Sequence, residues 1–184
     1  MRRDPGLVLE ELLVASAMAG SEAAFGQLVS RWTPRLMRHA RHLLHDSEAA
    51  RDVVQEAWIG AATGLRRLDD PARFAPWMFA LVSRRAVDCV RRAVRDRRLV
   101  AQASERVHET PCDTADALLD LRKAIARLPV GQRLVVSLHY GEGFGVEEIA
   151  AAHGLPPGTV KSRLFAAREA LRNYLEGDDH DEHR

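Results

Sequence analysis

A stretch from Gly145 to Leu164 constrains the fold of this chain more than any other part of its sequence. Its pattern predicts two short helices joined by a tight turn. Gly154 can adopt the positive φ that ends the first helix, and the proline pair after it prevents one continuous helix. Gly158 or Thr159 can then start the second helix, while Ala150 is small enough to let the two helices pack closely. This arrangement is typical of the helix-turn-helix, which offers its second helix to the major groove of DNA.

The second of these predicted helices has an apolar side and a polar side. Val160, Leu164 and Ala167 recur at helical spacing, which predicts the side that packs inward. The polar side, predicted to face DNA, carries Lys161, Ser162, Arg163 and Arg168. The alternative is an ordinary helical hairpin whose basic residues only solvate one face.

The formal net charge of +1 conceals a segregated charge distribution. Residues 1–100 carry 17 basic and 12 acidic side chains, and residues 122–175 carry eight and four. The segment between them, 101–121, has one basic and five acidic side chains, and so has the tail from residue 176. Two basic blocks separated and followed by acidic segments predict two polyanion-binding domains on a polar linker.

Helical periodicity runs through both basic blocks, and the alternation typical of strands is missing from the sequence. We therefore predict an all-α chain of two small helical domains joined by a flexible linker. Four helices are expected in the first block: Leu7 to Met18, Ser21 to Leu44, Asp46 or Ser47 to about Gly64, and Phe74 or Pro76 to about Arg98. Ser21 is the expected N-cap of the second helix, and Asp46 or Ser47 that of the third. The first is expected to be amphipathic through Leu9, Leu12, Leu13 and Ala17, and Pro34 should kink or split the second.

The second block is expected to begin with a helix near residues 115–118 that Pro129 and Gly131 break. A helix containing Leu134 and Tyr140 follows, and the helix-turn-helix ends near Leu175. The predicted limits are therefore a first domain, an acidic flexible linker, a second domain and an acidic disordered tail, at residues 1–100, 101–117, 118–175 and 176–184.

No sequence motif typical of an enzyme active site stands out, so we expect no catalytic residue, no cofactor and no metal site. His39, His42 and His45 could in principle bind a metal, but interleaved arginines favour a polar exposed face. Cys89 and Cys112 are too few for a disulfide scaffold, and Cys89 is expected to be buried. No signal peptide and no membrane-inserting segment is evident, which predicts a cytoplasmic protein.

The end of the fourth helix is unusually rich in arginine. Seven arginines occur there against two aspartates: Arg84, Arg85, Arg91, Arg92, Arg95, Arg97 and Arg98. Such a ridge can neutralise nucleic-acid phosphates. Trp58, Trp77 and Phe79 could supply aromatic surface for unstacked bases, although the alternative for the two tryptophans is a place in the core.

Two blocks of sequence, in the right order, resemble one family. Asp52 to Trp58, Phe74 to Phe79 and Asp88 to Arg92 resemble region 2 of the bacterial extracytoplasmic-function (ECF) sigma factors. Leu128 to Arg133, Glu148 to Ala150 and Gly158 to Leu164 resemble region 4 of the same family. The resemblance covers roughly residues 10–98 and 118–175, so it extends over nearly all of the two basic blocks.

The resemblance implies a promoter-specificity subunit of RNA polymerase, involved in a stress response and often held inactive by an anti-sigma factor. Asp52, Gln55 and Glu56 would then bind core RNA polymerase. Promoter DNA would be contacted at the −10 element by Arg66, Arg67, Asp69, Trp77, Arg84, Arg85, Asp88, Arg91 and Arg92. The −35 element would be contacted by Thr159, Lys161, Ser162, Arg163 and Arg168.

Two other functions remain as alternatives. One is a sigma-like decoy that sequesters an anti-sigma factor, against which the retained arginine ridge argues. The other is a plain helix-turn-helix regulator, which does not explain the Asp52 to Glu56 block. The sequence also departs from the family pattern, because Gly145 stands where a capping Ser or Thr is common. The resemblance further implies that the loop from Arg66 to Pro71 captures an extruded base, and Gly60 and Gly64 are expected to leave this base-capture loop more mobile.

Overall fold

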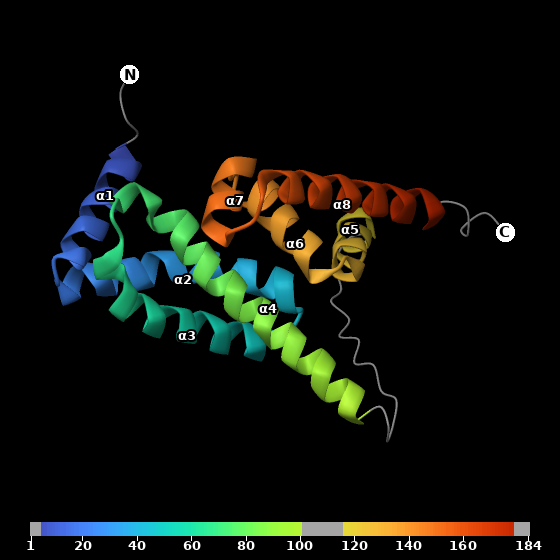
Figure 1. Cartoon of the computed structure of the whole chain (residues 1–184), viewed down its shortest axis with the longest axis horizontal. Helices are drawn as coiled ribbons and strands as arrows, with labels where there is room; N and C mark the ends of the chain where they lie inside the picture. The colour runs from blue at the N-terminus through green and yellow to red at the C-terminus, as the bar shows by residue number, and fades with distance from the viewer. Residues whose placement is uncertain (1–4, 101–115, 179–184) are drawn as a thin grey trace. The chain divides into compact units, whose positions relative to one another are not determined.

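A computed structural model of the chain describes residues 5–100 and 116–178 (Figure 1). Within these ranges the secondary structure is helical and contains no strand, which confirms the predicted all-α class. Most of the predicted linker, the end of the predicted tail, Cys112, His180 and His183 lie outside the described residues.

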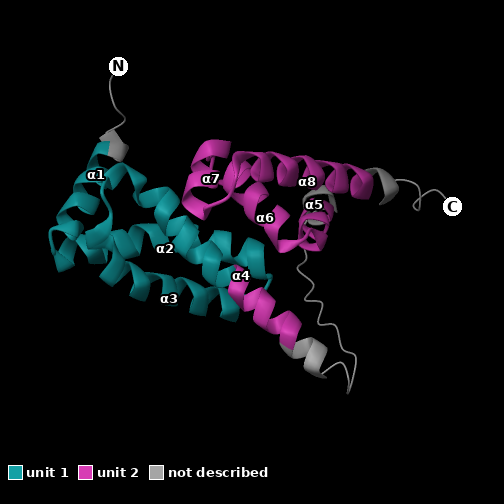
Figure 2. Ribbon diagram, in the orientation of Figure 1, with its two compact units in different colours: residues 1–86 teal, residues 87–184 magenta. Residues whose placement is uncertain are grey.

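The chain divides into two compact units, residues 1–86 and 87–184 (Figure 2). The division falls within one long helix, so the domain limits at residues 100 and 118 stay a prediction. Each unit is described separately.

The first unit holds three complete helices and the start of a fourth. They are α1 (Pro5–Met18), α2 (Glu22–Leu44), α3 (Ser47–Gly64), the short 3₁₀ turns η1 (Leu65–Arg67) and η2 (Pro71–Arg73), and α4 (Phe74–Val100). The predicted caps are confirmed: the Ser21 hydroxyl accepts from the Ala24 amide at 3.3 Å, and the Asp46 carboxylate accepts from the Glu48 amide at 2.8 Å. Both caps satisfy amides that have no partner inside their own helix.

The prediction for the first helix is partly wrong, and one of the two alternatives for the second does not occur. Leu9 and Leu12 on α1 are 47% and 59% exposed, whereas the predicted Ala17 is buried together with Val14, which was not predicted. α2 is not split at Pro34, since it continues from Glu22 to Leu44, and a kink at Pro34 stays a prediction. Burial of the α2 side that packs on α1 and α3 offsets the backbone hydrogen bond that the proline removes.

The core of the first unit lies where α2 meets α3 and the start of α4. The largest side chains that are fully buried on these helices are Leu28, Leu36, Leu43, Phe74, Met78 and Phe79. Trp32 meets Phe74 edge to face, with ring centroids 5.2 Å apart. Trp58 is also buried and donates its indole N–H to the Thr33 hydroxyl at 3.0 Å. Such edge-to-face packing and satisfied indole groups fix the relative rotation of the helices.

The predicted exposure of His39 is wrong. Its side chain is fully buried, and Nε2 lies 2.8 Å from the Ser83 hydroxyl of α4. The His39 ring also stands edge-on to Phe79, with centroids 5.1 Å apart. Because a buried polar group is costly unless it is hydrogen-bonded, Ser83 explains how a histidine fits among apolar side chains.

The second unit contains the rest of α4 and four further helices. They are α5 (Asp116–Arg127), α6 (Val130–Val136), α7 (Val146–His153) and α8 (Pro157–Asp178), with a π-helical turn η3 (Ser137–Gly141) after α6. α5, α6 and α7 all pack against α8. Gly131 lies inside α6 rather than at a break, because the break between α5 and α6 is formed by Leu128 and Pro129. α8 continues to Asp178, three residues past the predicted end.

The helix-turn-helix is formed by α7 and α8 as predicted. Gly154 ends α7 at φ 64°, and the Leu155 amide donates to the Ala150 carbonyl at 2.9 Å, which closes the end of the helix. Val160 and Ala167 on α8 are fully buried. α8 begins at Pro157, which is one residue earlier than predicted and suits proline because the first helical amide needs no partner.

Candidate protein and nucleic-acid interfaces

The outer side of α3 brings together the three residues predicted to bind polymerase. Asp52, Gln55 and Glu56 are all exposed, and their spacing of three and four residues places them on one face. The opposite side of α3 is buried through Val53, Val54, Ala57, Trp58 and Ala61. α3 therefore presents a polar surface whose orientation is fixed by a fully packed inner side.

Glu56 also contacts α4, which the sequence did not predict. Its Oε2 lies 3.7 Å from Nε of Arg85, a residue predicted to bind DNA. The guanidinium of Arg85 rests over Gly60, where an added Cβ would lie 2.7 Å from Nη2. Gly60 thus leaves the space that Arg85 occupies on α3, and the Arg85 side chain is only 29% exposed.

The predicted base-capture loop is the pair of 3₁₀ turns between α3 and α4. Arg66 and Arg67 lie in η1 and Asp69 follows it, and all three side chains are exposed. The Arg66 guanidinium passes close to Gly20, with Nη2 3.4 Å from where a Cβ would be. Asp70 caps η2, because its Oδ1 accepts from the Ala72 amide at 2.9 Å.

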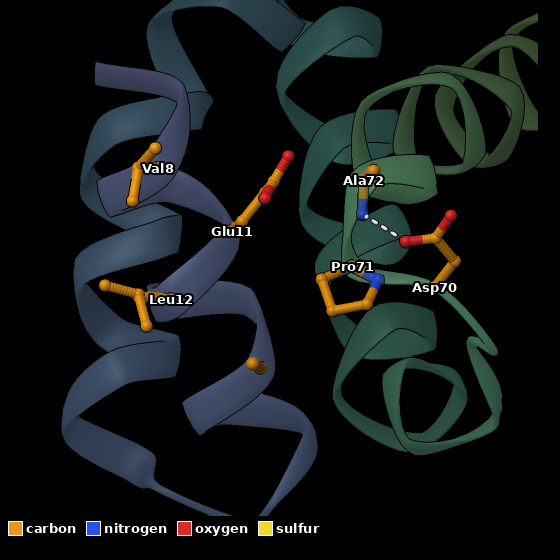
Figure 3. Close-up of a pocket in the computed structure, with 7 residues that line it drawn as sticks. Val8, Glu11, Leu12, Asp70, Pro71 and Ala72 are labelled. Carbon is orange, nitrogen blue, oxygen red and sulfur yellow. Dashed lines mark hydrogen bonds between the residues drawn. The ribbon is translucent and has the colours of Figure 1, made fainter. Parts of the chain in front are cut away.

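A shallow pocket of about 290 Å³ lies between α1 and η2, beside this loop (Figure 3). Its lining is mostly apolar and includes two carboxylates: Val8, Glu11, Leu12, Ala15, Asp70, Pro71 and Ala72. Leu12, whose exposure was not predicted, forms part of its α1 side.

Only one of the three candidate aromatic residues is available at the surface. Trp58 and Phe79 are buried, so they cannot stack on a base in this structure. Trp77 is half-buried on α4, and its ring edge packs over Gly64, where an added Cβ would lie 3.2 Å from Cζ2. Trp77 therefore remains the aromatic candidate, held against the end of α3.

Apart from Arg85, the arginines of α4 are exposed as far as their side chains are described. Arg84 is exposed, and its Nε donates to the Ala80 carbonyl at 3.2 Å. Further along, Asp88, Arg91 and Arg92 are exposed, and Arg91 Nη1 lies 3.9 Å from Asp88 Oδ1. These exposed pairs are weak, so the guanidinium groups are free to exchange them for phosphate.

The polar side of α8 carries the residues predicted to contact the −35 element, with one difference. Lys161, Ser162 and Arg168 are exposed and Thr159 is half-buried. Arg163 is also half-buried, and its guanidinium lies on α6, where a Cβ at Gly131 would be 3.4 Å from Cζ. Arg163 therefore packs on the body of its own unit, unlike the exposed Lys161.

Comparison with known proteins decides the family. Residues 28–96 match Sigma-70 region 2, and residues 118–171 match Sigma-70, region 4. The ECF RNA polymerase sigma factor SigL of Mycobacterium tuberculosis is 34% identical over 170 residues, covering 89% of this chain and 95% of SigL. The chain belongs to the ECF RNA polymerase sigma factors. The resemblance noted in the sequence is thereby confirmed, and a plain helix-turn-helix regulator would not account for the region 2 match.

Two further comparisons bear on this ECF sigma factor. The probable RNA polymerase sigma factor RfaY of Xanthomonas campestris is 30% identical over 169 residues, and the chain spans 42% of the length of RfaY. The sigma factor RpoE of Bartonella quintana, solved in complex with the anti-sigma factor NepR, matches with a TM-score of 0.67 at 26% identity. That match covers 83% of this chain and 96% of RpoE.

Glycines position several functional candidates of this sigma factor, and the sequence did not reveal it. Gly60 and Gly64 were interpreted only as weakening the end of α3, but each makes room for a side chain of α4. Gly131 does the same for Arg163. The signal available in the sequence was a glycine inside a helical pattern, where it costs about 1 kcal/mol relative to alanine and therefore needs a packing reason.

Arg133 has a structural role that was not predicted either. Its Nη1 donates to the Ala126 carbonyl near the end of α5 at 2.9 Å, which joins α5 to α6. Burial lowers the pKa of the Arg133 guanidinium from its ordinary value, because the charged form loses hydration. Since α6 and α5 both support α8, this contact stabilises the unit that carries the −35 candidates.

Neither a metal site nor a membrane span is found in the part of this sigma factor that the structure describes. No three histidine, cysteine, aspartate or glutamate side chains gather there in a way that could hold a metal ion. No helix in the same ranges has both the length and the apolar character to cross a membrane. Cys89 is half-buried and has a free thiol.

Proposed function

We propose that this chain binds core RNA polymerase in the cytoplasm and directs promoter-specific initiation of transcription, without catalysing a reaction itself. The observation that carries the proposal is the presence of sigma regions 2 and 4 in one chain and in that order, each with exposed polar residues among those that the resemblance implies. A decoy that only binds an anti-sigma factor would have no need of the exposed arginines of α4.

Binding to core RNA polymerase is assigned to the outer side of α3. Asp52, Gln55 and Glu56 offer two carboxylates and an amide to a basic partner surface. The Arg85 contact keeps the Glu56 carboxylate near the surface of α3.

Opening of the −10 element is assigned to the 3₁₀ turns and to α4. Arg66, Arg67 and Asp69 belong to the loop that would receive an extruded base, and Trp77 supplies an aromatic edge at the start of α4. The DNA strand on either side of that base would be bound by Arg84, Arg91 and Arg92. Asp88 would orient Arg91, and the contact with Glu56 on α3 would position Arg85. Unstacking costs a few kcal/mol per step, which capture of the base can offset.

Recognition of the −35 element is assigned to the exposed side of α8. Lys161, Ser162 and Arg168 face solvent and can reach a base edge or a phosphate, and Thr159 lies in the first turn of the helix. Arg163 is assigned a structural role in addition to its role at the −35 element. Its packing on α6 fixes the position of α8 and that of its own guanidinium.

Regulation by an anti-sigma factor is part of the proposal. The solved RpoE structure holds the anti-sigma factor NepR, and this chain matches RpoE over most of its length. We infer that a protein of that class holds this sigma factor inactive until a stress releases it.

The test is reconstitution with purified core polymerase. The chain should bind core and start transcription from its promoter, and reversing the charges of Asp52 and Glu56 should weaken core binding. A matched control reverses Asp120 on α5, which is partly exposed and far from the assigned residues in sequence. Failure of the unaltered chain to bind core would overturn the proposed function, and binding without any transcription would favour the decoy.

A further inference from the structure

The polar side of α3 has a large apolar side chain at its centre. Ile59 is 63% exposed, and it follows Asp52, Gln55 and Glu56 by seven, four and three residues. These separations place Ile59 on the same face as the three polar residues. The other large apolar side chains of α3 are Val53, Val54 and Trp58, and all of them are buried. The inner side of α3 is therefore complete without Ile59.

The surroundings of Ile59 suit a partner that comes close. Ala62 and Thr63, three and four residues later, are exposed and small, so they leave space beside the isoleucine. The acidic residues lie on the other side, toward the start of α3. One large apolar group between small and polar neighbours is the arrangement in which interfaces concentrate their binding energy.

Charge alone is a weak source of affinity on this face. The Glu56 carboxylate already lies 3.7 Å from Arg85, so part of its charge is compensated within the chain. Exposed charges are also screened over about 8–10 Å at physiological salt. An apolar contact does not suffer from either effect, and its strength follows the area removed from water.

We propose that Ile59 is the apolar anchor of the α3 surface, defined as Asp52, Gln55, Glu56, Ile59 and Thr63, and that it enters an apolar pocket on a basic surface of core RNA polymerase. The inference rests on the proposed function and names the chemistry of the partner at that site. Charge complementarity accounts for the basic surface, and the exposed isoleucine accounts for the pocket.

The experiment measures the affinity of the full chain for core polymerase at several salt concentrations. Ile59→Ser should weaken binding about tenfold, since most of the value of one buried isoleucine would be lost. The dependence of log Kd on log salt should stay unchanged, because no charge is removed. Asp52→Asn should instead make that dependence less steep. The matched control is Leu9→Ser on α1, which should leave Kd unchanged. Leu9 is also exposed, and its side chain is the same size as that of Ile59.

Three outcomes overturn the inference. Normal affinity of Ile59→Ser, with Asp52→Asn impaired, would remove the anchor but leave the proposed function intact. An equal loss of affinity in Leu9→Ser would show that exposed apolar side chains contribute nonspecifically and that Ile59 is not an anchor. Absence of binding by the unaltered chain would overturn the inference together with the proposed function. Unchanged thermal stability of each variant, measured in parallel, separates loss of contact from loss of fold.

Discussion

Glu56 on α3 and Arg85 on α4 form an ion pair, with Oε2 and Nε 3.7 Å apart. The sequence placed these residues on different surfaces, one for polymerase and one for DNA. The pair exists because Gly60 lacks a side chain, so that the Arg85 guanidinium can lie flat on α3. The two proposed surfaces of the first unit therefore share a contact.

Replacing Gly60 with alanine should not give the stability that this change usually gives inside a helix. Alanine is favoured over glycine by about 1 kcal/mol at a helix interior, but a Cβ at residue 60 would lie 2.7 Å from Arg85 Nη2. We expect the free energy of unfolding of Gly60→Ala to be unchanged or lower, measured by chemical denaturation. Adding Arg85→Ala should restore the gain, because the blocking side chain is then gone.

Gly26 on α2 is the matched control for that experiment. It is exposed, and a Cβ added there meets nothing within 4 Å. Gly26→Ala should therefore raise the free energy of unfolding by about 0.5–1 kcal/mol. An equal gain in the free energy of unfolding from Gly60→Ala would contradict the position of the Arg85 guanidinium over Gly60.

A capping hydroxyl at residue 145 should stabilise the start of α7. The Gly145 amide already donates to Glu148 Oε2 at 2.8 Å, but glycine has no side chain to accept from the amides of the first turn. Gly145 has φ −67°, which serine adopts without strain. We expect Gly145→Ser to raise the free energy of unfolding by a few tenths of a kcal/mol. A lower melting temperature would show that the new side chain displaces Glu148 instead.

Arg163 and Lys161 should respond differently to truncation, although both are basic residues of α8. Arg163→Ala removes the packing on α6 and should destabilise the second unit by about 1 kcal/mol as well as weaken DNA binding. Lys161→Ala should leave the melting temperature unchanged, because Lys161 is exposed. If Lys161 contacts a phosphate, its loss should weaken binding to all DNA sequences alike. It should also lower the slope of log affinity against log salt concentration by about one. A melting temperature of Arg163→Ala equal to that of the unaltered chain would contradict its structural role.

Glu10 on α1 should make the chain less stable as the pH rises. Burial raises the pKa of its carboxyl above the ordinary value of 4.5, although Arg35 and Arg31 act in the opposite direction. The folded state then holds this proton more tightly than the unfolded state, so the stabilisation present at low pH is lost as the pH rises through the folded pKa. Glu10→Gln should raise the melting temperature at pH 7.

The pH profile of Glu10→Gln provides the check. Its advantage should shrink as the pH falls toward 4.5, because the unaltered carboxyl becomes neutral in the folded state. A difference in melting temperature that stays constant over that range would mean that the effect of the substitution does not come from the ionisation of Glu10.

Local sequence rules predicted the elements that depend on local chemistry. Ser21, Asp46 and Gly154 were identified from their residue types, because a capping side chain or a positive φ acts within one helical turn. The same rules failed for Leu9 and Leu12, and the split that they allowed at Pro34 does not occur. There the packing of α2 overrides the proline, and the side of α1 that is buried depends on where its neighbours lie.

The sequence by itself determined the all-α class, the helix-turn-helix and the family, because helical period, caps and motif spacing are properties of short segments. Only the tertiary structure decided which polar side chains are exposed. His39 is buried by its bond to Ser83, Arg85 is drawn onto α3, and Arg163 is drawn onto α6. Each of these depends on a hydroxyl or a glycine from another helix. The physical reason is that burial of a polar group requires a partner and a space, and both come from parts of the chain remote in sequence.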